Sequence, residues 1–161
     1  MVFARSRILS RLMLLFWAVW FSVVWASNMA DGLQEAGVLP PSWRFTSGNF
    51  ALVADSLVIY SLSRMWADAL FVLVLVIQLA AAFLFWRATL EPDLQSPGAN
   101  SKILQAFFVG VGWISAFLVC DEVLLIYRRV PTLETTHFVI LCALLLSFLV
   151  INLSGDREQA A

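Results

Sequence analysis

Four long apolar segments limit the structures that this chain can adopt more than any other feature of its sequence. A helix that crosses the hydrocarbon core of a bilayer needs about 20 mostly apolar residues, and the segments at about 11–29, 66–86, 103–127 and 133–153 meet this requirement. Charged residues make up only 13% of the 161 residues, against about 25% in soluble domains. The sequence therefore predicts an all-α, polytopic membrane protein, a four-transmembrane-helix bundle that forms a single membrane domain over residues 1–161. The composition argues against a soluble enzyme.

The first connection, residues 30–65, is long and contains a further apolar stretch. Gly37, Pro40 and Pro41 mark its first part as a loop. The apolar stretch at about 50–62 is too short to cross a bilayer. Asp55, in its middle, also argues against deep burial in lipid. We therefore expect an extra interfacial or re-entrant helix in this loop.

The other two connections differ in length. Residues 88–101 are rich in proline, glycine and polar residues, which predicts a loop. The connection at 128–132 is very short, so the third and fourth long helices are expected to be antiparallel neighbours.

The first apolar segment follows Arg5, Arg7 and Arg11, as the core of a secretory signal peptide would. It is longer than the apolar region of a signal peptide, which spans about 7–15 residues. Tryptophans at positions 17, 20 and 25 also make it bulky. We therefore expect this segment to be retained as a membrane helix.

Lys and Arg residues near the helix ends predict the orientation, because cytoplasmic loops carry an excess of them. The side of the two termini has Arg5, Arg7, Arg11, Arg87, Lys102 and Arg157, and the opposite side has Arg44, Arg64, Arg128 and Arg129. We therefore expect a multi-pass protein of the bacterial inner membrane with both termini in the cytoplasm.

Ionisable residues inside the apolar segments are the only functional lead, since a charge in hydrocarbon is costly. At about 1.5 Å per residue, Glu122 lies ~10 Å from the end of the third helix and His137 lies ~9 Å into the fourth, so the two meet at one depth on the outer side. Glu134 and His137 have the i, i+3 spacing by which helix bundles present a carboxylate and an imidazole to a metal. The predicted metal ligands are Glu122, Glu134 and His137, with Asp121 and Asp68 as supporting groups around them.

A stripe of small and polar residues is expected to turn Glu122 toward the bundle interior, because such residues are typical of interfaces between membrane helices. The stripe lies within an arc of about 80° and consists of Gln105, Gly112, Ser115 and Glu122. Asp121 falls about 100° from Glu122, on the face of Gly110. Gln78, near the middle of the second long helix, is expected to donate a hydrogen bond to another helix.

The same carboxylates also suit roles that involve no metal. They are able to pair with Arg64, Arg128 or Arg129 at the water boundary, and Asp68 and Glu134 suit the first turns of helices, where a carboxylate complements the helix dipole. The cluster also suits a small amphiphile such as a quinone or a lipid. A single histidine excludes bis-histidine haem and three-histidine metal sites within the chain. The sequence does not identify any other cofactor. The net charge of −1 provides no basic surface for nucleic acid.

Three short motifs accompany the apolar segments. They are Asn28-x-x-Asp31 after the first segment, Gly48-Asn49-Phe50 in the long connection, and Asp121-Glu122 late in the third segment. In these motifs and its four spans, the chain resembles an uncharacterised bacterial family, the predicted small integral membrane proteins. The resemblance implies the same four-span fold and no particular activity.

The sequence contains no recognisable catalytic motif, so we do not expect a catalytic centre. It favours an accessory or interaction subunit of a membrane assembly, surrounded by the lipid bilayer and by other membrane subunits. A ligand or metal site at the outer face is the first alternative, and a proton or solute pathway is the second.

Overall fold

The computed structural model describes residues 2–94, 96–126 and 130–159, and every regular element within them is helical. The elements are α1 (Val2–Glu35), α2 (Asn49–Leu57), the short 3-10 helix η1 (Val58–Tyr60), α3 (Arg64–Thr89), α4 (Pro97–Val123) and α5 (Pro131–Gln159). Four of these helices are long and apolar enough to cross a membrane. The predicted all-α fold, with four spanning helices and a shorter extra helix, is therefore confirmed.

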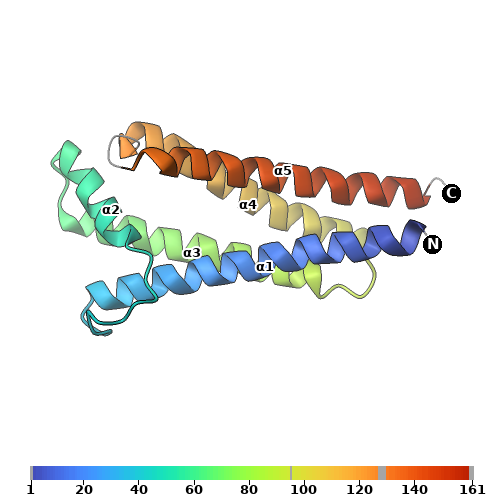
Figure 1. Ribbon diagram of the computed structural model, residues 1–161, viewed down its shortest axis with the longest axis horizontal. Coiled ribbons are helices and arrows are strands. Elements are labelled where there is room, and N and C mark those ends of the chain that lie inside the picture. The colour runs from blue at the N-terminus through green and yellow to red at the C-terminus, as the bar shows by residue number, and fades with distance from the viewer. Residues whose placement is uncertain (1, 95, 127–129, 160–161) are drawn as a thin grey trace.

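The four long helices form an elongated bundle in which α1 pairs with α3 and α4 pairs with α5 (Figure 1). Helix α3 also packs on α4, and α1 on α5, so the bundle closes on itself. Helix α1 begins and α5 ends at one end, which we call the terminal end (Figure 1). Helix α2 packs on α1 and α3 at the opposite end, which we call the α2 end.

The core of the bundle is a row of aromatic rings from three helices. Phe21 of α1 stacks on Phe85 of α3, with ring centroids 5.3 Å apart. Phe85 meets Phe107 of α4 edge to face, at 5.1 Å. All three side chains are fully or almost fully buried. Offset and edge-to-face pairs of this kind add to the stability that burial provides.

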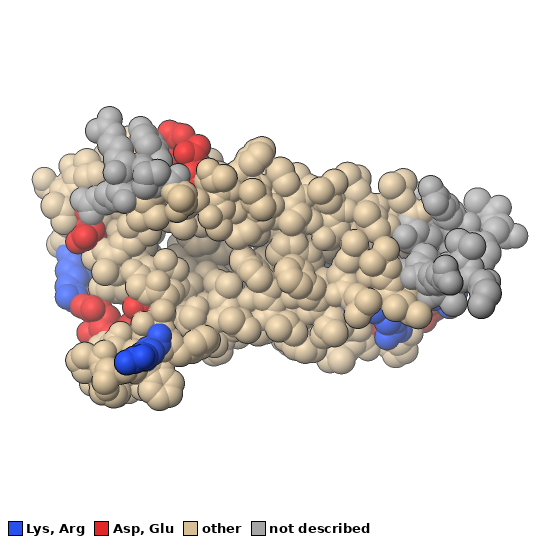
Figure 2. Space-filling view, in the orientation of Figure 1, with Lys and Arg blue, Asp and Glu red and all other residues tan. Residues whose placement is uncertain are grey.

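Most of the outer surface of the helices is apolar. Large side chains are more than half exposed on every long helix, for example Phe16, Val72, Phe108 and Leu146. On the face in Figure 2, the charged side chains of the described residues lie toward the two ends of the molecule. An apolar exterior that continues around a bundle with polar ends suits a lipid environment.

The inward face of α4 differs from the expected one. Gln105, Gly112 and Glu122 of the polar stripe are exposed, so the expectation that this stripe points inward is wrong. The buried face instead consists of Ala99, Ile103, Ala106, Phe107, Gly110, Ile114 and Asp121. These positions recur at intervals of three and four residues, which is the spacing of one helix face. Aromatic packing selects this face, because Gly110 leaves room for the rings of Phe21 and Phe85.

Helix α4 ends earlier than the sequence suggests. The apolar segment continues to residue 127, but the helix stops at Val123 and Leu125 adopts a left-handed backbone with φ 52°. A left-handed residue breaks the helical hydrogen-bond pattern and turns the chain. Helix α5 then begins at Pro131, whose fixed φ suits the first helical position.

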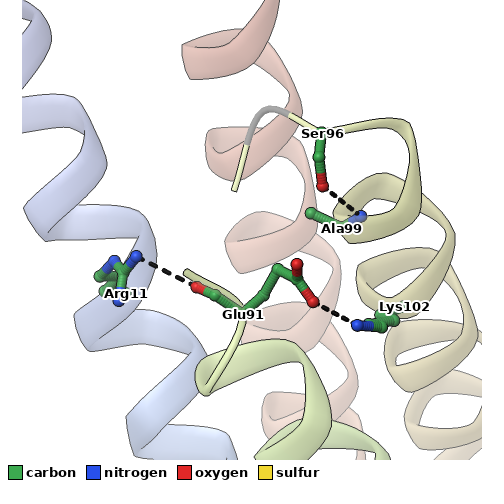
Figure 3. Close-up of polar contacts among 5 residues, drawn as sticks. All are labelled: Arg11, Glu91, Ser96, Ala99 and Lys102. Carbon is green, nitrogen blue, oxygen red and sulfur yellow. Dashed lines mark hydrogen bonds and ion pairs between the residues drawn. The ribbon is translucent and has the colours of Figure 1, made fainter. Parts of the chain in front are cut away.

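Polar contacts at the terminal end hold the α3–α4 connection in place (Figure 3). The guanidinium of Arg11 on α1 donates to the backbone oxygen of Glu91 at 3.1 Å, and the Glu91 carboxylate pairs with Lys102 of α4. The Ser96 hydroxyl accepts a hydrogen bond from the Ala99 amide at 3.0 Å and caps α4. This group of charges therefore joins α1, the connection and α4.

Substitution of Gly110 tests the packing of α4. A Cβ atom at Gly110 lies 3.2 Å from the Phe85 ring, whereas one at Gly112 meets no atom within 4 Å. We expect Gly110→Leu to lower the free energy of unfolding by about 1–3 kcal/mol, the usual cost of overpacking. Gly112→Leu, with the same gain in helix propensity, is the control and should not lose stability. Thermal unfolding in detergent followed by circular dichroism checks this, and equal losses in both variants would contradict it.

Candidate functional site

A chain of three side-chain amides crosses the interior near the α2 end. The Asn28 side chain donates to Gln78 Oε1 at 2.8 Å, and Asn28 Oδ1 accepts from the Asn49 side chain at 2.9 Å. Asn28 and Gln78 are buried. The chain connects α1 to α3 and to α2. It confirms a hydrogen bond between Gln78 and another helix, but Gln78 accepts this bond rather than donating it. Buried amides need such partners, because an unpaired polar group in an apolar interior is costly.

Asp31 of α1 fixes the start of α2. Its Oδ2 accepts hydrogen bonds from the Phe50 backbone N–H at 2.8 Å and from the Ser47 hydroxyl at 3.0 Å. The residue before α2 is Gly48, which has a left-handed backbone with φ 72° and no side chain to cap the helix. A carboxylate from another helix therefore satisfies a free N–H at the N-terminus of α2, where negative charge is favourable.

A second polar group lies late in α4 and early in α5. His137 Nδ1 and Asp121 Oδ2 are 2.6 Å apart, and the Asp121 side chain is only 1% exposed. The His137 ring stacks on Phe117 with centroids 4.9 Å apart and planes 8° from parallel. Phe117 in turn packs on Trp113 at 4.3 Å. The imidazole is thus held by a hydrogen bond at one nitrogen and by an aromatic face.

The other oxygen of Asp121 has no partner among the residues that the structure describes. Asp121 Oδ1 is buried and makes no hydrogen bond to the described part of the chain. Leaving one acceptor of a buried charged group unsatisfied costs about 1–3 kcal/mol or more. Buried polar atoms without a partner are few in native proteins, and a bound molecule or a functional role is a common reason for one.

A cavity of about 150 Å³ lies between these two polar groups. Each of the five α-helices contributes to its wall, and Figure 2 shows a hollow between the α4–α5 pair and the α2 end of the α1–α3 pair. Its polar lining residues are Asn28, Asn49, Gln78, Asp121, Thr136 and His137. Its aromatic lining residues are Trp20, Phe21, Phe71, Trp113 and Phe117.

The structure does not bring the three predicted metal ligands together. His137 lines the cavity, but its carboxylate partner is Asp121, while Glu122 is exposed and Glu134 is half-buried. Asp68 is exposed, with a carboxylate oxygen 4.0 Å from Arg64 Nε. In residues 2–94, 96–126 and 130–159, no three His, Cys, Asp or Glu side chains come together as metal ligands would.

Two further groups of residues need comparison with the sequence analysis: the arginines after α4 and the amide chain. Arg128 and Arg129, the suggested partners of the acidic residues, lie outside the described residues. The amide chain of Asn28, Asn49 and Gln78 is absent from the predicted site, although two of its members belong to the short motifs. The signal that finds them is the placement of Asn28 and Gln78 inside apolar segments.

Comparison of the chain with models of protein families, with curated proteins and with solved structures finds no match. The role of the site is therefore inferred from its geometry and chemistry. Both point to the cavity, whose lining includes polar groups from all five α-helices.

Removal of the Asp31 carboxylate tests how α2 is held. We expect Asp31→Ala to raise amide hydrogen exchange in Asn49–Leu57 by about tenfold or more, since a buried donor that loses its acceptor costs about 1–3 kcal/mol. Asp68→Ala is the control, because its exposed pair with Arg64 is worth about 0–1 kcal/mol. Hydrogen–deuterium exchange with mass spectrometry makes the measurement. Unchanged protection of α2 in Asp31→Ala would show that apolar packing alone holds the helix.

Proposed function

We propose that this protein is a membrane-embedded binding protein whose small ligand occupies the cavity at the α2 end. One observation carries the proposal: Asp121, almost fully buried, lines the cavity and has an oxygen without a hydrogen-bond partner among the described residues. A ligand with a hydrogen-bond donor would satisfy that oxygen. The stability lost in the free protein would then be regained on binding, which makes the site suited to a ligand.

The composition of the cavity wall supports this role. Pockets for small molecules are mostly apolar and aromatic, with a few polar groups that orient the ligand. Here aromatic rings of α1, α3 and α4 form much of the wall, and Asp121, His137 and the amide chain of Asn28, Asn49 and Gln78 also line it. The ligand we infer has an apolar body and a polar head.

The short motifs support the same site. Asn28 and Asn49 line the cavity with Asp121, and Asp31 holds Phe50 at the start of the helix that forms one wall. We therefore propose that the resemblance to the predicted small integral membrane proteins is a likeness in this site. With the termini in the cytoplasm of a bacterial cell, as the arginines before α1 predict, the cavity would lie in the outer half of the inner membrane.

Three other roles stay predictions. An accessory subunit would use the apolar outer faces of the helices, which suit lipid and partner helices equally. A metal site would need Glu122 and Glu134 to approach His137. A proton or solute pathway would need a continuous route, whereas the described core at the middle of the bundle is closed by Phe21, Phe85 and Phe107.

Benzyl alcohol is a suitable first probe, because it has a benzene-sized body and a hydroxyl donor, and an apolar cavity of about 150 Å³ accommodates benzene. We expect saturable binding to the full chain in lipid nanodiscs. Val24 lines the cavity, so Val24→Phe should fill it and abolish binding. Val23 is 50% exposed, and Val23→Phe, which adds the same volume outside, should leave binding intact.

Isothermal titration calorimetry with subtraction of empty nanodiscs separates binding from partition into lipid. Circular dichroism of both variants checks that they keep their helices. Equal binding to Val24→Phe and the unmodified protein would place the probe elsewhere and contradict the proposal.

A further inference from the structure

We propose further that the ligand is a small organic ammonium ion with an apolar body, bound between Asp121 and the aromatic wall of the cavity. The inference rests on the proposed function and specifies its ligand class. Its basis is that Asp121, whose Oδ1 has no hydrogen-bond partner among the described residues, lines the same cavity as several aromatic rings.

The contact between His137 and Asp121 determines what the free oxygen needs. His137 Nδ1 lies 2.6 Å from Asp121 Oδ2, which is a hydrogen-bond distance. The oxygens of a carboxylate only accept hydrogen bonds. The ligand must therefore present a donor, which excludes a head group that consists of carbonyl oxygens alone.

The charge of the pair favours a cationic donor. A carboxylate at Asp121 places a negatively charged group in a buried site. Among the described residues, the ion pair of Asp121 is with His137, and Arg64 at the same end pairs with Glu35 and Asp68. A buried charge is costly unless an opposite charge compensates it. An ammonium group supplies both that charge and the missing donors.

The aromatic residues of the cavity suit the same ligand. Trp20 and Trp113 belong to the cavity wall together with Asp121. The faces of such rings attract cations, most strongly where water is excluded. The rings also provide apolar surface for the body of the ligand. The volume of about 150 Å³ limits this body to roughly the size of a benzene ring.

Other ligand classes match the site less well. An anion would face the Asp121 carboxylate directly. A hard divalent cation needs several oxygen ligands, and no group of three ligating side chains exists within the described residues. A neutral alcohol satisfies Oδ1 but leaves the negative charge uncompensated.

Three probes of one shape and different charge test the inference: benzylammonium, benzyl alcohol and benzoate. In titrations of the full chain in nanodiscs, we expect benzylammonium to bind about tenfold more tightly than benzyl alcohol, from its charge-assisted hydrogen bond and its contact with aromatic faces. Benzoate should not bind. Benzyl alcohol that binds as tightly as benzylammonium would overturn the ligand class and leave the proposed binding function in place. No binding of either probe beyond empty nanodiscs would overturn both.

Asp121→Asn supplies a second, independent readout. If the new carboxamide oxygen accepts from His137, its NH₂ group takes the place of Oδ1 and presents donors instead of an acceptor. We expect benzylammonium to lose its advantage and benzyl alcohol, which also accepts hydrogen bonds, to keep binding; this retained binding shows that the variant is folded. Glu122→Gln, on the exposed face of the same turn, is the matched control and should preserve the ranking. If benzylammonium still bound more tightly than benzyl alcohol to Asp121→Asn, the role of the carboxylate would be contradicted. If this variant does not fold, the relative affinities of the two probes for the unmodified protein still decide the ligand class.

Discussion

Gly110 lets the rings of Phe21 and Phe85 pack against α4, and this contact selects the face of α4 that points into the bundle. Three helical turns later the same face presents Asp121, which is how a carboxylate comes to be buried in an apolar interior. The exposed glycine at position 112 offers a second small surface but no ring packs on it. The register of α4, and with it the chemistry of the cavity, therefore depends on an aromatic contact that itself contains no polar atom.

The two ends of the bundle use polar groups in different ways. At the terminal end, Arg11, Glu91 and Lys102 form contacts that hold the α3–α4 connection against its neighbours. At the α2 end, the amide chain of Asn28 and the pair of Asp121 with His137 lie inside the bundle, on two sides of a cavity. Polar groups that satisfy one another join helices, whereas a buried oxygen without a partner among the described residues is a group that a bound molecule can satisfy. This difference is what directs the functional proposal to the α2 end.

The fold could be predicted from the sequence, whereas the site could be predicted only in part. Apolar length alone identifies four spanning helices, because hydrocarbon thickness sets the length that a helix needs. The depth of His137, counted along α5, correctly puts it near the acidic end of α4. The sequence predicts Glu122 as the partner of His137, because small and polar residues are expected to face inward. The partner is Asp121 instead, because the packing of large rings against Gly110 determines which face of α4 is buried. The sequence contained a competing signal, since Asp121 follows Ile114 by seven residues and shares its face.

The sequence by itself determined that the chain forms four helices long and apolar enough to cross a membrane, because the number and length of its apolar segments and the scarcity of charge are properties of the chain alone. It also limited the polar interior to a few residues at defined depths. Only the tertiary structure decided which of them meet: Asn28 with Gln78 and Asn49, Asp31 with the start of α2, and Asp121 with His137. The physical reason is that depth follows from counting residues along one helix, whereas facing direction follows from how rings on neighbouring helices fit together.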